Sequence, residues 1–123
     1  DLGLGAIDVV IVDIHVEAAR ALRQRLADLA KAVDAELLVV EALTHESYHL
    51  RGILDEARAE CYALQSSIRT AIALGLTAET AAALNTYYAS ALYPRLPSGY
   101  HSADCRPGGA FDLHPETPAW PAG

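Results

Sequence analysis

The first predicted element comes from a dense apolar run near the N-terminus. Residues 6–16, AIDVVIVDIHV, are rich in β-branched side chains, and Asp8, Asp13 and His15 interrupt the run. Because β-branched residues favour extended backbone, this pattern predicts a strand. We expect one or a few such strands at this end of the chain, before the helices begin.

Apolar positions then change to the period of three to four residues that is typical of an amphipathic helix. A first helix is predicted over residues 17–33, with arginines on the face opposite its apolar stripe. Asp34 is a good N-cap residue, so a second helix is predicted to follow it over residues 35–51. Residues 37–40 are all apolar, which predicts that this helix is buried on most sides.

Glycine and threonine mark the ends of the next elements. Gly52 is placed to end the second helix in the left-handed conformation that glycine adopts without strain. A third helix is predicted over residues 53–74, ending at Gly75. Thr77 then caps a fourth helix that extends to about Leu92.

Prolines and repeated glycines exclude regular structure beyond this point, so residues 94–123 are predicted to be an irregular tail. At 123 residues the chain is expected to form a single domain, with the strand and the helices in residues 1–93. The predicted fold class is therefore mainly α, with a minor β part (α+β).

Composition narrows the classes of partner. The chain holds 16 Asp and Glu against 9 Lys and Arg, and no basic cluster appears, which argues against nucleic acid. The longest apolar runs are too short for a transmembrane helix. The chain has no methionine, even at its first position, so we expect a processed form or a fragment. Its alanine-rich composition, with more arginine than lysine, suggests a GC-rich bacterial source.

Five residues of the second helix carry the clearest chemistry. His45 to His49 spell HESYH, a match to the HExxH signature of zinc-dependent hydrolases. Residues four apart lie on one face of a helix, so both imidazoles can bind one tetrahedral Zn²⁺ and leave a position open for water. Glu46 points to another side, from which it can reach that water as a general base.

A second acidic element follows this motif. Residues 55–60, DEARAE, resemble the NExxSD or NExxAD element of the gluzincin metallopeptidases, the thermolysin-like clan. The resemblance covers about residues 40–63 and implies that Glu56 is the third zinc ligand and that Glu60 supports a zinc histidine, His45. A histidine ligand needs an acceptor for its other ring nitrogen, which agrees with the role of Glu60.

A different set of zinc ligands also fits these letters. Residues 45–55 match HExxHxxGxxD, the spacing of the metzincin group, in which Asp55 would be the third ligand. Metzincins carry a methionine turn beneath the metal, and this chain has no methionine. Glu56 is therefore preferred and Asp55 is the alternative. The gap from His49 to Glu56 is shorter than in thermolysin, so the two helices must connect by a tight turn.

Two cysteines, Cys61 and Cys105, allow one disulfide, which we favour, or two free buried thiols. A disulfide would fasten the tail to the helix that carries the third ligand, and it favours a secreted or extracytoplasmic protein. The tail would then bring Tyr100, His101 or His114 near the metal. A tyrosine or histidine in such a place often stabilises the oxyanion in metallopeptidases.

The resemblance implies a compact, zincin-like helical domain that hydrolyses peptide bonds. Zn²⁺ is the implied cofactor, held by His45, His49 and Glu56, and a peptide or protein is the implied substrate. Glu46 would activate water to attack the peptide carbonyl. The alternative is a non-catalytic protein of the same fold, with structural zinc or none, that acts as a binding module. The sequence leaves the oligomeric state open.

Overall fold

The structure, a computed structural model, describes residues 4–121, and it describes the side chains of residues 16–29 and 31–121. The chain divides into two compact units, residues 1–36 and 37–123. One helix, α1 (Leu4–Leu50), has residues in both units. The expectation of a single domain stays a prediction, and every candidate site residue belongs to the second unit.

The predicted N-terminal strand is wrong, because residues 6–16 lie within α1. Over residues 4–121 the structure contains no strand, so an extended segment here would leave its backbone groups without a ladder partner. In a helix the backbone N–H and C=O groups of these residues form hydrogen bonds with one another. Each β-branched residue costs only about 0.5 kcal/mol of helix propensity relative to alanine, which helix continuation offsets.

The predicted helix boundary at Asp34 is also wrong, since α1 continues through this residue. An aspartate inside a helix costs only about 0.7 kcal/mol relative to alanine, and favourable neighbours on both sides tolerate it. The apolar stripe predicted over residues 17–33 is not buried in the first unit. Leu22, Leu26 and Leu29 are each more than half exposed.

The predicted turn at Gly52, the glycine after the next helix and the Thr77 cap agree with the structure, whereas the third helix begins three residues later than predicted and the fourth ends at Tyr87. Gly52 has φ 97° and ends α1; its N–H donates to the carbonyl of His49, and the next N–H donates to that of Tyr48. This is the paired bonding of a Schellman turn. The following helices are α2 (Glu56–Ala73), which is followed by Gly75 in the left-handed conformation, and α3 (Ala78–Tyr87), which is capped by Thr77.

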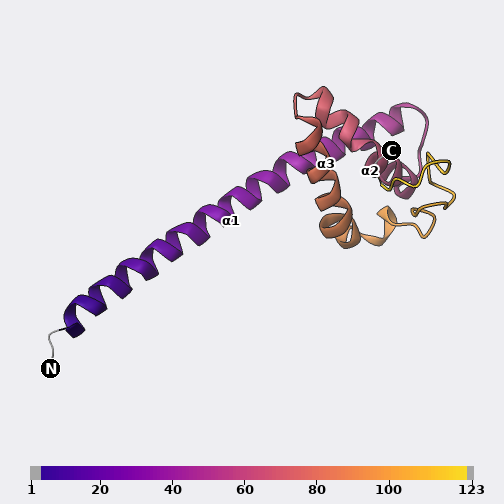
Figure 1. The fold of residues 1–123 in the computed structure, drawn as a ribbon. Helices are drawn as coiled ribbons and strands as arrows, with labels where there is room; N and C mark the ends of the chain where they lie inside the picture. Colours follow the sequence, from indigo (N-terminus) through magenta and orange to yellow (C-terminus); the bar gives the residue numbers. More distant parts are fainter. Residues whose placement is uncertain (1–3, 122–123) are drawn as a thin grey trace. The chain divides into compact units, whose positions relative to one another are not determined.

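The prediction of a mainly helical chain is confirmed. In the second unit α2 and α3 pack against the C-terminal part of α1 (Figure 1). A π-helical turn, η1 (Tyr88–Leu92), continues α3, and two 3-10 turns follow, η2 (Tyr93–Arg95) and η3 (Ser98–Tyr100). Two small clusters form the core, each with one residue from α1, one from α2 and one from α3 or η1. They are Leu37, Leu64 and Tyr88, and Val40, Ala71 and Ala81.

The tail beyond η3 is irregular, as predicted, and it is fastened to α2. The predicted disulfide between Cys61 and Cys105 is confirmed, and it closes a loop with a sequence separation of 44. A disulfide that closes a loop of this length lowers the conformational entropy of the unfolded chain and so stabilises the folded state by about 4 kcal/mol. Gln65 adds two bonds of 2.8 Å to the tail backbone, donating to the Phe111 carbonyl and accepting from the Leu113 N–H.

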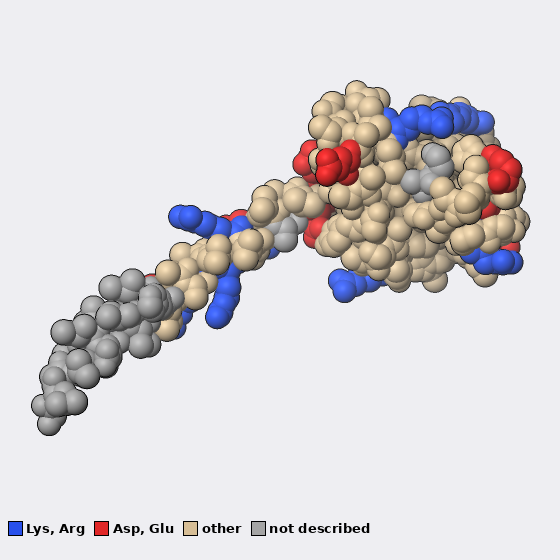
Figure 2. Space-filling model, viewed as in Figure 1, with Lys and Arg blue, Asp and Glu red and all other residues tan. Residues whose placement is uncertain are grey.

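No helix among the described residues is both long and apolar enough to span a membrane. Figure 2 shows one face of the molecule, on which most of the described surface carries neither acidic nor basic side chains.

Candidate metal centre

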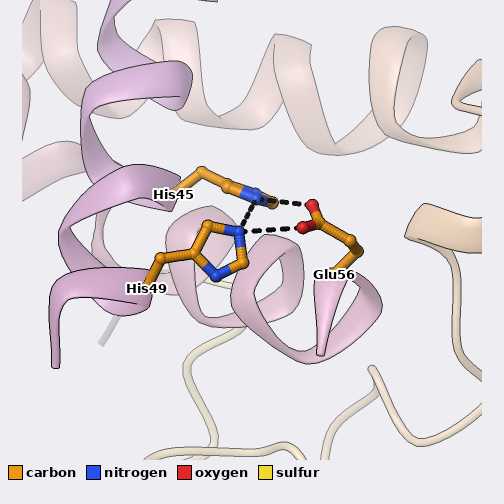
Figure 3. Close-up of side chains that lie close together, drawn as sticks. All are labelled: His45, His49 and Glu56. Carbon is orange, nitrogen blue, oxygen red and sulfur yellow. Dashed lines mark hydrogen bonds and ion pairs between the residues drawn. The ribbon is translucent and has the colours of Figure 1, made fainter. Parts of the chain in front are cut away.

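Three side chains from two helices meet at one point. His45 and His49 lie one turn apart on α1, and Glu56 is the first residue of α2 (Figure 3). The two Nε2 atoms are 2.8 Å apart, and the Glu56 carboxylate oxygens lie 3.0 Å from His45 Nε2 and 3.1 Å from His49 Nε2. The Gly52 turn is what brings the start of α2 to the end of α1.

The opposite ring nitrogens of both histidines face acceptors. His45 Nδ1 lies 2.6 Å from Glu60 Oε2, and His49 Nδ1 lies 2.6 Å from the carbonyl oxygen of Ile53. Because a carboxylate and a carbonyl only accept, each Nδ1 carries the proton and each Nε2 presents a lone pair. Two lone pairs and the Glu56 carboxylate then face one another, an arrangement that a cation at its centre would satisfy.

The dimensions fit a small metal ion. A tetrahedral ion with ligands at about 2.0 Å sets its ligand atoms roughly 3.3 Å apart, so this cluster must expand by only a few tenths of an ångström. His45 is buried, His49 is half-buried and Glu56 is exposed, so one side of the cluster stays open. His45, His49 and Glu56 could therefore hold a metal ion.

Electrostatics around the cluster favour positive charge. The pKa of His49 is raised, first because the Ile53 carbonyl accepts from its ring, and then by the negative charges of Glu56 and Glu46, while burial lowers it. A raised pKa means that the site stabilises a cation at this imidazole.

Glu60 links the cluster to the core. It is 6% exposed; one carboxylate oxygen accepts from His45 and the other accepts from the Tyr88 hydroxyl. Burial raises the pKa of Tyr88, followed by its bond to Glu60, so this hydroxyl keeps its proton. The sequence did not single out Tyr88 for this role, because 28 residues separate it from Glu60 and only the packing of η1 on α2 brings them together.

Asp55 caps a helix and is not brought to the histidines, whereas the metzincin spacing suggests that it is the third metal ligand. Its side chain accepts from the N–H of Arg58 at 2.8 Å and so caps α2. An N-cap carboxylate is held at the helix terminus by this bond. The structure thus brings Glu56 to the histidines and places Asp55 at the start of the helix.

The three tail candidates lie in different surroundings. Tyr100 lines the pocket beside the cluster, with its ring centroid 6.0 Å from that of His45. His101 Nε2 lies 2.5 Å from the carbonyl oxygen of Tyr93, and His114 pairs with Glu116. Of the three, Tyr100 is the residue that the structure brings next to a zinc-motif histidine.

A pocket of about 370 Å³ opens beside the cluster. His45, Glu56 and Glu60 line it, and so does Glu46, which is exposed. Glu46 therefore borders the same space as two of the three candidate ligands. A molecule in this pocket can lie beside His45, Glu56 and Glu46 at once.

Replacing Glu60 with glutamine tests its positioning role. We expect Glu60→Gln to weaken binding of Zn²⁺ about 10- to 100-fold, because it removes the charged acceptor that fixes the His45 ring. Competition titration with a chromophoric chelator measures this change. Glu116→Gln, an exposed change of the same charge, is the control, and equal zinc affinity in both variants would show that Glu60 does not support His45.

Comparison with known proteins adds no relative. No protein-family model, no curated protein and no solved structure matches this chain. The resemblance to gluzincins therefore stays a prediction from the residues of the two motifs.

Proposed function

We propose that this chain is a zinc-dependent hydrolase of the metallopeptidase type, similar to the gluzincins. One observation carries the proposal: the Nε2 atoms of His45 and His49 converge on the Glu56 carboxylate, while both Nδ1 atoms face acceptors. Two nitrogens, one carboxylate and an open side form the ligand set of catalytic zinc sites.

Zinc in this place supplies a Lewis acid that polarises a carbonyl and lowers the pKa of water. The protein residues do the rest. The Glu46 carboxylate, on the pocket wall, takes a proton from the attacking water and passes it to the leaving amine. Tyr100 borders the same pocket, where its hydroxyl can donate to the developing oxyanion.

We assign the protein to an extracytoplasmic compartment. The disulfide between Cys61 and Cys105 supports this location, since such bonds persist mainly in oxidising environments. An extracytoplasmic peptidase would meet peptide or protein substrates there.

The first experiment is metal analysis after exhaustive dialysis. We expect about one zinc per chain in the parent, and loss of that zinc in His49→Ala and in Glu56→Ala, because two remaining ligands hold the ion far more weakly than three. The thermal midpoint should fall when a chelator removes the ion, since binding to the folded state alone stabilises it.

His114→Ala and Glu79→Ala are the matched controls, because both residues lie outside the cluster. Both should keep their zinc. A parent chain without zinc, or zinc retained in His49→Ala and Glu56→Ala alike, would contradict the proposed site.

A further inference from the structure

A residue that lines the same pocket carries a buried carboxyl group that the proposed reaction does not use. Glu41 is on α1, one turn before His45, and it is 3% exposed. Neither of its carboxyl oxygens has a hydrogen-bond partner. Burial raises its pKa to about 8; Glu60 raises it further, and the nearby Ser67 hydroxyl lowers it without forming a well-aligned hydrogen bond.

Leaving a carboxyl in this state costs about 1–3 kcal/mol or more, so native proteins rarely keep one without a reason. An apolar residue would fill this place at lower cost, because Glu41 continues the buried stripe of Leu37, Val40 and Thr44. A donor that enters the pocket would give the carboxyl group the partner that the protein does not supply.

The rest of the pocket lining indicates the chemistry of that donor. Apolar side chains and three more acidic residues line the pocket, and no Lys or Arg is among the described residues that line it. Such a space fits a positive charge carried on an apolar stem. The apolar residues are Leu38, Ala42, Leu96, Pro97 and the ring of Tyr100, and the acidic residues are Glu46, Glu56 and Glu60.

A second metal ion fits this place less well. Glu41 does not belong to the group of possible metal ligands, and Glu60 is already engaged by His45 and Tyr88. An inorganic cation needs several oxygen or nitrogen ligands, whereas an ammonium or guanidinium group needs one carboxylate and an apolar wall.

Distance favours a side chain over the terminal amine of a substrate. One helical turn separates Glu41 from His45, about 6 Å along α1. The α-amino group of a terminal residue lies only about 2.5 Å from the carbonyl carbon of that residue, whereas the lysine stem spans roughly 6 Å. A carbonyl at the cluster therefore places a basic side chain, and not an α-amine, near Glu41.

We propose that Glu41 determines specificity, in a subsite that binds the cationic side chain of a lysine or arginine flanking the scissile peptide bond. This inference rests on the proposed peptidase function and names its substrate class. Glu41 binds substrate in this role and takes no part in proton transfer at the reacting carbonyl.

Direct binding tests the subsite without catalysis. We would titrate the protein in the presence of zinc with n-butylammonium and with n-butanol, following methyl shifts by NMR. We expect the parent and the control Glu79→Gln to bind the amine at least 10-fold more tightly than the alcohol. Glu41→Gln should bind both equally, because glutamine keeps the shape of the side chain but cannot ionise when the amine binds. Equal binding of the amine by the parent and Glu41→Gln would overturn the proposal.

Peptide cleavage separates this inference from the proposed function. Two peptides that differ only by lysine or norleucine beside the scissile bond should differ at least 10-fold in kcat/KM with the parent, and this ratio should approach one with Glu41→Gln. Zinc-dependent cleavage of both peptides at the same rate would contradict the proposed subsite but agree with the proposed peptidase function. No cleavage of any peptide, together with amine binding through Glu41, would support the cation site and overturn the peptidase.

Discussion

Glu46→Gln should abolish most peptide hydrolysis while leaving the zinc in place. Glu46 borders the pocket beside His45 and Glu56, but it is not among the three residues that could hold the ion. A glutamine has nearly the same shape and cannot accept the proton of the attacking water. Loss of a general base lowers the rate by about 10²- to 10⁴-fold, so kcat/KM on a cleaved peptide should fall by this factor.

The measurement pairs steady-state kinetics with zinc content for the same preparation. Glu79→Gln, the same chemical change at an exposed position of α3, should leave kcat/KM unchanged. Full activity in a zinc-loaded Glu46→Gln protein would show that Glu46 takes no part in the reaction. A parent that holds zinc but cleaves no peptide would instead favour a structural metal in a binding module.

The sequence predicted the second unit better than the first. Around the site, Gly52, Gly75 and Thr77 mark turns and caps whose conformations only a few residue types adopt well, and the structure agrees at all three. Over residues 6–16 the choice between strand and helix depends on whether another strand is available to pair. Local composition does not contain that information, so the β-branched run led to the wrong element.

The ligand set was accessible from sequence because its geometry is local. His45 and His49 are one helical turn apart, and Glu56 follows a turn that a single glycine fixes. Tyr88 was not accessible, because its contact with Glu60 depends on how η1 packs on α2. The position of Glu41 could have been recognised from the sequence. It is an acidic residue on the buried face of α1, four residues before a zinc-motif histidine.

Glu41→Gln should stabilise the metal-free protein at alkaline pH and leave it unchanged under acid conditions. The folded pKa of Glu41 is about 8, above its ordinary value of 4.5. Below pH 4.5 both the folded and the unfolded chain hold the proton. Between the two values only the folded chain keeps it, so the free energy of unfolding falls as the pH rises, and the loss levels off above pH 8.

For these two pKa values the loss amounts to about 4 kcal/mol at pH 8, an order-of-magnitude figure. A glutamine does not titrate and escapes this loss. Denaturant unfolding at a series of pH values, with a chelator present because a bound cation would lower the Glu41 pKa, should therefore show the variant and the parent diverging from pH 5 to 8.

Other ionisable groups face the same space in both proteins, so only the difference between parent and variant reports on Glu41. They are His45, Glu46, Glu56, Glu60, Tyr88 and Tyr100. Glu79→Gln should run parallel to the parent at every pH, because this side chain is exposed. A constant difference between the parent and Glu41→Gln would mean that Glu41 is ionised in the folded protein. Its carboxylate would then have a partner or solvent contact that offsets the cost of burial. That result would remove the energetic argument for a cationic ligand at Glu41.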